Sequence, residues 1–508
     1  MKSFKVFLLI FISISTVYGS DFYVDIEGND SEGNGSKEKP WRTVAYAIKK
    51  IPANQPQTLR ISSGTFYENN AIEVPPKISL VGAGIDLTIL KAAKSFYYNS
   101  ASPDLAPEKF LIRLDGRENT AGDQHLKSFT IDGASKQLHG GIYVHGRHNV
   151  LIENVKVQYT NFCGLWILKT ENSTARNVAL LNCAWGNTDW CSGALQFAYA
   201  HNVEFDQLTI DEDKGYGIKT LGQGKDHVLK NFKLHDSHIS VNPKGLWQNG
   251  KAPNISIEIW ANAFQQSEIY NCYVDNHISI VNVDHDVEPT GEKFRIHHNT
   301  IDLTKRAGGE GYGLELTIHD AEVDHNIFKG GMWGIVNWAQ PKQNWSIHHN
   351  IFYELNNVNP GAIINAYKGN LQHVNIYNNT VELHGKATIN FLECNNGGVS
   401  DDVKIQNNLI INSNTEYVHY PNRFINLEAG STIKNLLVQN NVLFNMPLGE
   451  LEGTMKNNYF VDPKISRSGN RPFPFYSPAL NSPLKDAGCK LDFPYNGLAP
   501  DIGAYESK

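Results

Sequence analysis

The stretch Ser346-Ile-His-His-Asn-Ile-Phe352 decides the fold, because close copies of it recur along the chain. Each copy places an Asn three positions after an aliphatic residue and follows it with another aliphatic pair. The recurrence falls within the ~20–50-residue periods typical of solenoids. An amide side chain at the same turn of every coil can donate to one copy and accept from the next. We therefore predict a stacked Asn ladder at Asn154, Asn177, Asn231, Asn271, Asn299, Asn326, Asn350, Asn379, Asn408 and Asn441.

A second short aliphatic segment precedes each copy and predicts a strand. Its first inward side chain is expected at positions 142, 165, 195, 218, 257, 280, 314, 335, 363 and 389. Side chains alternate along a strand, so the next residue of each segment should point outward onto one long parallel sheet. The predicted fold class is all-β, a parallel β-helix.

The two ends of the chain predict a leader, a cap and a closing segment. Residues 1–19 combine a basic start, a short apolar run and small residues, which indicates a signal peptide and a secreted or periplasmic protein. The run is too short to span a bilayer, so no membrane insertion is expected. One β-helix domain should fill 20–508. Its cap at about 20–75 includes a helix over 43–51, and an irregular closing segment starts at about 460.

Composition narrows the class of partner. The net charge is −7, and Lys and Arg form no stripe, which disfavours a nucleic acid. Six Cys are too few for a disulfide scaffold. Buried thiols are expected at Cys163, Cys272 and Cys394, whereas pairing of Cys183 with Cys191 stays open. We expect a monomer that binds a polysaccharide or oligosaccharide.

Both termini carry a family resemblance. The opening Phe22-Tyr-Val-Asp-Ile-Glu-Gly with Lys39-Pro-Trp-Arg-Thr-Val-Ala resembles that of pectate-lyase-like right-handed β-helix proteins. The ending Ser482-Pro-Leu-Lys-Asp-Ala-Gly with Pro500-Asp-Ile-Gly-Ala-Tyr-Glu is similar to the tail of many exported bacterial members. With the coil pattern, the resemblance covers nearly the whole chain after the leader. It implies right-handed coils and action on carbohydrates, by lyases, hydrolases, epimerases or esterases. Asp401-Asp402 lacks the Gly-His-Gly partner of polygalacturonases.

Polar and aromatic residues gather on the outward face of the middle coils. Insertions there, over 235–251, 284–293 and 305–312, mark a binding face. We predict that the side chains that bind sugar are His145, Trp166, Trp247, Trp260, His319 and Trp338.

A catalytic set is expected on the same face, comprising Lys219, Glu258, His285, Arg306 and Glu315. One interpretation is β-elimination on a uronic acid, which needs a base, an acid and a cation for the carboxylate. Lys219 is then the base, activated by flanking cations. Arg306 or Lys305 clamps the carboxylate, and His285 or His319 serves as acid or base. The leaving group is a sugar in a lyase or water in a dehydratase.

No cofactor is required by this chemistry, although calcium fits a set of hard oxygen ligands. The candidate metal ligands are Asp284 and Asp286, with Glu258 and Glu315 as further oxygen donors.

Two alternatives remain open. The first is a glycoside hydrolase. Glu258 and Glu315 would then occupy equivalent outward positions with one coil between them, roughly 9–10 Å apart. That spacing is at or beyond the wide end for inverting enzymes and too far for a retaining pair. Glu258 with Asp284 is the closer alternative. The second is a non-catalytic glycan-binding β-helix, which the clustering of Lys, His and carboxylates disfavours.

Overall fold

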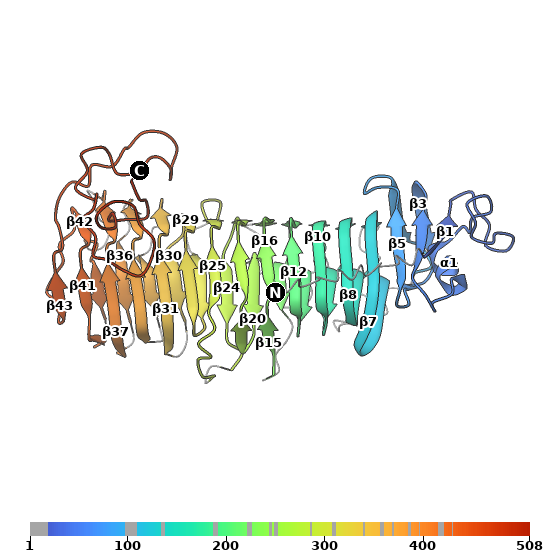
Figure 1. Ribbon diagram of the computed structural model, residues 1–508, viewed down its shortest axis with the longest axis horizontal. Helices are drawn as coiled ribbons and strands as arrows, with labels where there is room; N and C mark the ends of the chain where they lie inside the picture. Colours follow the sequence, from blue (N-terminus) through green and yellow to red (C-terminus); the bar gives the residue numbers. More distant parts are fainter. Residues whose placement is uncertain are drawn as a thin grey trace, which may run out of the picture.

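The computed structural model describes residues 19–96, 109–133, 138–185, 192–220, 226–242, 246–247, 252–253, 255–284, 287–306, 311–338, 341–355, 360–367, 370–384, 388–395, 397–414, 421–428 and 430–507. Figure 1 shows an elongated stack of strands, with the single described helix α1 (Val44–Lys50) at one end and β43 (Thr454–Lys456) at the other. Neighbouring coils pair in parallel, which confirms the predicted β-helix. None of the described helical residues forms a segment with the length and apolarity needed to cross a membrane.

The strands form three parallel ladders, and the long strands β7, β8 and β10 bend from one ladder into another. Ladder A consists of β4 (Ile72–Glu73), β7 (Phe110–Asp132), β8 (Gly140–Gln158), β9 (Cys163–Leu168), β11 (Gly193–Ala198), β14 (Tyr216–Thr220), β20 (Ile257–Trp260), β24 (Ile278–Val281), β27 (Tyr312–Thr317), β30 (Trp333–Asn337), β33 (Gly361–Ala366), β36 (Ile389–Cys394) and β39 (Ile425–Leu427).

Ladder B follows ladder A along each coil. Besides β7 and β8 it contains β1 (Ser20–Val24), β2 (Gln57–Ile61), β5 (Ile78–Gly82), β10 (Glu171–Leu181), β12 (His201–Asp206), β15 (Val228–Lys230), β16 (Lys233–His235), β21 (Ala263–Gln265), β22 (Glu268–Tyr270), β25 (Phe294–His297), β28 (Ala321–Asp324), β31 (Lys342–His348), β34 (Leu371–Tyr377), β37 (Val399–Gln406), β40 (Thr432–Lys434), β41 (Leu437–Gln439) and β43.

Ladder C closes each coil. Besides β7, β8 and β10 it contains β3 (Gly64–Glu68), β6 (Thr88–Ala92), β13 (Thr209–Glu212), β17 (His238–Val241), β23 (Tyr273–Val274), β26 (Thr300–Asp302), β29 (Ile327–Lys329), β32 (Ile351–Tyr353), β35 (Thr380–Leu383), β38 (Leu409–Asn412) and β42 (Val442–Phe444). A separate antiparallel pair joins β18 (Leu246–Trp247) to β19 (Ala252–Pro253).

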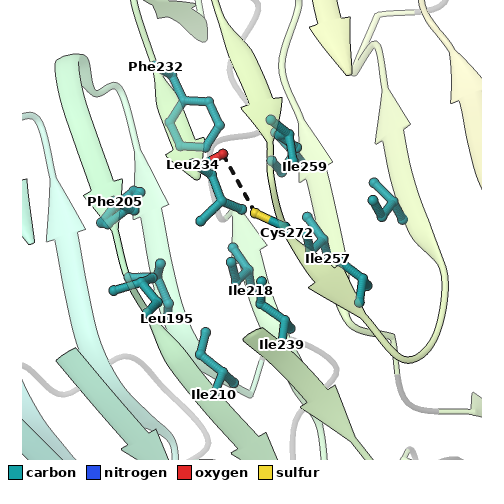
Figure 2. Packing of buried hydrophobic residues seen from close by; sticks show 14 of the residues in the cluster. Leu195, Phe205, Ile210, Ile218, Phe232, Leu234, Ile239, Ile257, Ile259 and Cys272 are labelled. Atoms are coloured by element: carbon teal, nitrogen blue, oxygen red, sulfur yellow. Dashed lines mark hydrogen bonds between the residues drawn. The ribbon is translucent and has the colours of Figure 1, made fainter. Parts of the chain in front are cut away.

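Inward side chains from the three ladders form one continuous core. Figure 2 shows Ile218 of ladder A, Leu234 of ladder B and Ile239 of ladder C close together, all with no solvent exposure. The thiol of Cys272 lies among them, 3.8 Å from the Leu234 carbonyl oxygen. Burying each such aliphatic side chain contributes about 1.5–3 kcal/mol, which holds successive coils in register.

The Asn ladder is present in the C-terminal half of the chain. The side-chain amides link Asn299 to Asn326, and the chain of bonds continues through Asn350, Asn379, Asn408, Asn441 and Asn458. In the N-terminal half the ladder is confirmed only in part. Asn154, Asn177 and Asn271 lie one residue earlier, at a turn position with φ between 50° and 53°. Asn177 Nδ2 donates to Asn154 Oδ1 at 2.6 Å, as predicted, whereas Asn271 donates to Asp236 instead of another Asn. Asn231 lies at a different turn and donates to Asn202.

The ends of the stack are covered in different ways. The predicted N-terminal helix is α1, whose buried residues Val44, Ala47 and Ile48 join the core. The residues after β43 contain no further helix or strand up to residue 507. They pack along the outer side of ladder C, where Tyr476 and Ile502 join a cluster with residues of β32, β38 and β42. Cys163, Cys272 and Cys394 are buried free thiols as predicted, and so is Cys183. Cys191 and the leader residues 1–18 lie outside the described residues.

Candidate functional site

One outward column of ladder A carries most of the predicted catalytic residues. The register pairs Gln196 with Lys219 and Lys219 with Glu258. It then pairs Glu258 with Ser279 and Ser279 with Glu315. Parallel strands lie about 4.8 Å apart, so five successive coils present these side chains as one strip, and one coil lies between Glu258 and Glu315.

Lys219 is held by a carboxylate and by aromatic rings. Its ammonium forms an ion pair with Glu258. It also lies 4.3 Å from the centroid of the Tyr216 ring and 5.8 Å from that of Trp260. Lys219 is 4% and Glu258 8% exposed, so water screens this pair weakly. The contacts favour the charged ammonium. These contacts come from a carboxylate and aromatic rings, and the activation of Lys219 by flanking cations stays a prediction.

Glu315 is a buried carboxyl group in contact with hydroxyl groups. Ser279 Oγ donates to Glu315 Oε2 at 2.5 Å, and Tyr312 forms a second side-chain hydrogen bond. Burial raises the pKa of Glu315 above its usual range, and the hydrogen bonds offset only part of this effect. Glu315 therefore keeps its proton to a higher pH than an exposed glutamate does.

Glu315 links folding stability to pH. The folded chain holds the Glu315 proton at pH values where the unfolded chain has released it, because the folded pKa is the higher one. Stability should fall as pH rises from the ordinary pKa of 4.5 through the raised folded value. Glu315→Gln cannot ionise, so its Tm should drop less than that of the wild type between pH 5 and pH 8. Exposed Glu32 gives the control: Glu32→Gln should follow the wild-type pH curve, and a wild-type curve for Glu315→Gln would refute this coupling.

Arg306 reaches this strip from the turn after β26. Its Nη1 donates to Asn276 Oδ1 at 2.8 Å and to His277 Nδ1 at 2.6 Å. Burial and the adjacent guanidinium lower the pKa of His277 well below its usual range. His277 is therefore neutral, with its proton on Nε2, because Nδ1 accepts from arginine. That Nε2 is buried without a hydrogen-bond partner.

A second outward column, two residues further along each strand, adds aromatic rings. Trp260 lies on it at the end of β20, and Trp338 lies on it just beyond the end of β30. The Trp338 ring packs edge-to-face against Tyr312, Trp333 and Tyr367, with centroids 4.9–5.8 Å apart. All four rings are half-buried. Trp260 and Trp338 thus border the strip on which Lys219 and Glu315 lie.

His319 lies at the edge of this face. It lines a small pocket with Asn262, Asn282 and Glu292. Burial and the nearby Lys342 lower the pKa of His319 to about 4, so its imidazole is neutral near pH 7. Asp284 lies close by, with its amide nitrogen donating to Asn262 Oδ1 at 2.7 Å.

Two predicted sugar-binding residues do not lie on an open part of the central strip. Trp166 is only 4% exposed, because it packs in a cluster with Phe110, Tyr143 and Phe162. Its ring face is therefore unavailable to a ligand, which corrects the prediction. His145 lies on β8, several coils away, and contacts Asp115 at 3.1 Å.

Three further predicted residues are not described at side-chain level: the backbone of Trp247 lies in β18, and His285 and Asp286 lie outside the described residues.

Calcium binding by Asp284 and Asp286 stays a prediction, because Asp286 lies outside the described residues. Glu258 is already paired with Lys219, and burial favours the neutral form of Glu315. Within the described part of the chain, the groups of His and carboxylates close enough to share a metal lie on ladder B, around Asp324 and His235. Asp284 belongs to none of these groups.

Sequence reasoning missed four polar residues of the site: Asn276, His277, Ser279 and Tyr312. The signal for Ser279 was present, since it directly follows an inward isoleucine of β24. His277 and Tyr312 stand at strand ends, where alternation does not fix the direction of a side chain.

Comparisons with known proteins agree on the fold. Residues 112–286 match the family model described as the right handed beta helix region. No curated protein matches the chain. A mutant tailspike protein of E. coli bacteriophage HK620, solved with a pentasaccharide, is 12% identical, covers 84% of this chain and 79% of its own, and has a TM-score of 0.52. Pectate lyase Pel9A is 15% identical over 96% of both chains, with a TM-score of 0.32. The A-module of Azotobacter vinelandii mannuronan C-5 epimerase AlgE4 is 15% identical over 77% and 94%, with a TM-score of 0.41. At these identities the likeness concerns the fold alone.

Proposed function

We propose that this chain is an exported enzyme that cleaves an anionic, uronate-containing polysaccharide by β-elimination along the outward face of ladder A. One observation carries the proposal: two buried carboxyl groups in different electrostatic environments share one strip with Lys219. Glu258 is paired with the Lys219 ammonium, whereas burial raises the pKa of Glu315. Pairs of titratable groups pushed apart in this way are typical of acid–base catalysis.

The cations favour an anionic substrate. Lys219 lies on the strip, and Arg306 donates to Asn276 and His277, which directly precede β24 of ladder A. A uronate carboxylate bound to Lys219 would displace Glu258 from its ion pair. Neutralising that carboxylate makes the proton on the adjacent carbon more acidic, which is the first requirement of elimination. The fold match to a tailspike solved with a pentasaccharide supports a saccharide as the ligand class.

In the proposed reaction Glu258 acts as the base and Glu315 as the acid. Glu258, released from Lys219, takes the proton from the carbon beside the uronate carboxylate. That electron pair forms a double bond to the next ring carbon, whose bond to the leaving oxygen breaks. Glu315 donates its proton to the departing oxygen. Lys219 and Arg306 remain charged throughout and stabilise the negative charge that develops on the carboxylate.

Hydrolysis is the second candidate, because the same two glutamates also provide a base and an acid. A separation of about two strand spacings, roughly 9–10 Å, is at the wide end for inverting hydrolases. Glu258 would then take a proton from water, and Glu315 would protonate the leaving oxygen in the same way.

The products separate these reactions. We expect incubation with uronate polysaccharides to generate an ultraviolet-absorbing unsaturated uronate together with one new reducing end for each bond broken. New reducing ends without absorbance would select hydrolysis. A protein shown to be folded that produced neither signal from any uronate or neutral polysaccharide in the panel would refute the enzymatic proposal.

Arg306 should act mainly on substrate binding. Arg306→Gln removes a charged donor for the uronate carboxylate, so KM should rise roughly tenfold or more, because hydrogen bonds to charged groups contribute about 1.5–3 kcal/mol. Steady-state kinetics on the cleaved polymer measure this change. Arg60→Gln is the control, since Arg60 is an exposed arginine paired with Asp21 on ladder B. An unchanged KM in Arg306→Gln would remove Arg306 from the binding site.

A further inference from the structure

The outward face of ladder A changes character beyond Glu315. The first column continues through Val336, Asn365, Glu393 and Asn426. The second column continues with the residues that follow the ends of β30, β33, β36 and β39, namely Trp338, Tyr367, Asn395 and Glu428. Rings and amides therefore replace the cations of the strip around Lys219.

Glu393 is a fixed negative charge in this region. Its carboxylate is 7% exposed and accepts amide hydrogens from Asn390 at 2.6 Å and Asn395 at 3.1 Å. Longer contacts come from Asn365 at 3.3 Å and Asn426 at 3.4 Å. Among the described residues no ion pair involves Glu393. The nearby Arg423 donates to Asn426 Oδ1 at 2.7 Å. A second carboxylate placed over Glu393 would be repelled by it.

Two amide oxygens in this region have no hydrogen-bond partner among the residues that the structure describes. Asn365 is 1% exposed, turns its nitrogen toward Glu393 and leaves its buried Oδ1 unpaired within the described part of the chain. Asn395 does the same from the second column. An unpaired acceptor gains from a ligand hydroxyl, because buried polar groups without hydrogen bonds are costly. The half-buried rings of Trp338 and Tyr367, 4.9 Å apart, border these oxygens on the second column.

We infer that the face formed by Trp338, Tyr367, Asn365, Asn395 and Glu393 binds uncharged sugar units, so that the substrate is a heteropolysaccharide carrying neutral sugars next to the uronate that is cleaved. Rings provide apolar surface for sugar faces, and amide oxygens accept from hydroxyl groups. The fixed charge of Glu393 excludes a second uronate. This inference rests on the proposed function for the uronate, but the neutral-sugar site itself does not need catalysis.

Binding of neutral oligosaccharides tests the inference directly. Titration of the full chain with glucose-, mannose-, galactose- and xylose-based oligosaccharides, followed by calorimetry and tryptophan fluorescence, should reveal at least one ligand. Trp338→Ala should raise its Kd by about tenfold or more, which corresponds to about 1.4 kcal/mol. Asn395→Ala should weaken binding without removing a ring. Tyr67→Ala is the matched control, because this 59% exposed ring lies away from ladder A, on β3.

Two results would overturn the inference. The first is that no neutral oligosaccharide binds to the folded protein. The second is that Trp338→Ala weakens binding of homopolymeric uronate oligosaccharides as much as that of neutral ones. A chain that binds neutral sugars but cleaves no uronate polymer would instead refute the proposed function and leave this site standing.

Discussion

Replacing Lys219 with alanine should lower kcat/KM by roughly 100-fold or more, because the ammonium is the cation that the uronate carboxylate meets and the partner that keeps Glu258 ionised. The measurement is the initial rate of product formation on the polysaccharide that the wild type cleaves. Lys404→Ala is the matched control. Lys404 lies on β37 of ladder B, 3.1 Å from Asp402, and its loss should leave the rate unchanged.

Loss of one partner of a buried ion pair also destabilises a protein, by about 3–5 kcal/mol. Lys219→Ala therefore needs a variant that separates chemistry from folding. Lys219→Met combined with Glu258→Gln leaves no uncompensated charge and should regain most of the wild-type Tm while remaining inactive. A folded double variant with wild-type turnover would exclude both residues from catalysis.

Asn350→Ala should cost roughly 3 kcal/mol or more in the free energy of unfolding. Asn350 Oδ1 accepts from the backbone nitrogen and the side chain of Asn326, and its Nδ2 donates to Val323 O and Asn379 Oδ1. The variant removes these bonds and leaves their partners buried without hydrogen bonds. Urea unfolding followed by circular dichroism measures the loss.

The same coil region offers a control for Asn350. Asn375 lies on an outward, half-buried position of β34. Asn375→Ala should change stability by no more than about 0.5 kcal/mol. Equal shifts in the two variants would mean that the amide ladder adds nothing beyond ordinary surface asparagines.

The sequence predicted the register of ladder A where each segment has one clear aliphatic position. Leu195, Ile218 and Ile257 lie in one inward column, as expected. Where a segment contains two or three adjacent or alternating aliphatic residues, the predicted inward position was wrong. Ile278, not Ile280, aligns with Ile257, and Ile364, not Ile363, aligns with Ile335. Single-residue alternation cannot separate neighbours that are both buried.

The Asn ladder illustrates a second limit. Asn has two separate uses at this turn, because it stacks side-chain amides and also tolerates positive φ. Asn299 stacks its side-chain amide without a positive φ, whereas Asn177 has a φ of 50° and also donates its side-chain amide to Asn154. Both satisfy the same short motif. Only the backbone angle and the bonds to neighbouring coils distinguish them.

The candidate site was predicted as a set of positions but not as a set of contacts. Alternation and coil stacking place Lys219, Glu258 and Glu315 on one strip. What the pattern could not give was the side-chain partner of each. Lys219 faces Glu258 and Tyr216, and Trp166 is enclosed by neighbouring rings. Such partners depend on rotamers and on loop residues far away in the sequence.

The segment that follows β43 changes how the last coils can come apart. It contacts four successive coils, through Phe493 on His349, Ala504 on Thr380, Cys489 on Asn407 and the Tyr476 cluster on Val442. A solenoid without such a covering segment unfolds from its terminus, one repeat after another. Here the terminal coil cannot separate from its neighbours while this segment stays bound. These coils should therefore unfold together, as a single cooperative unit.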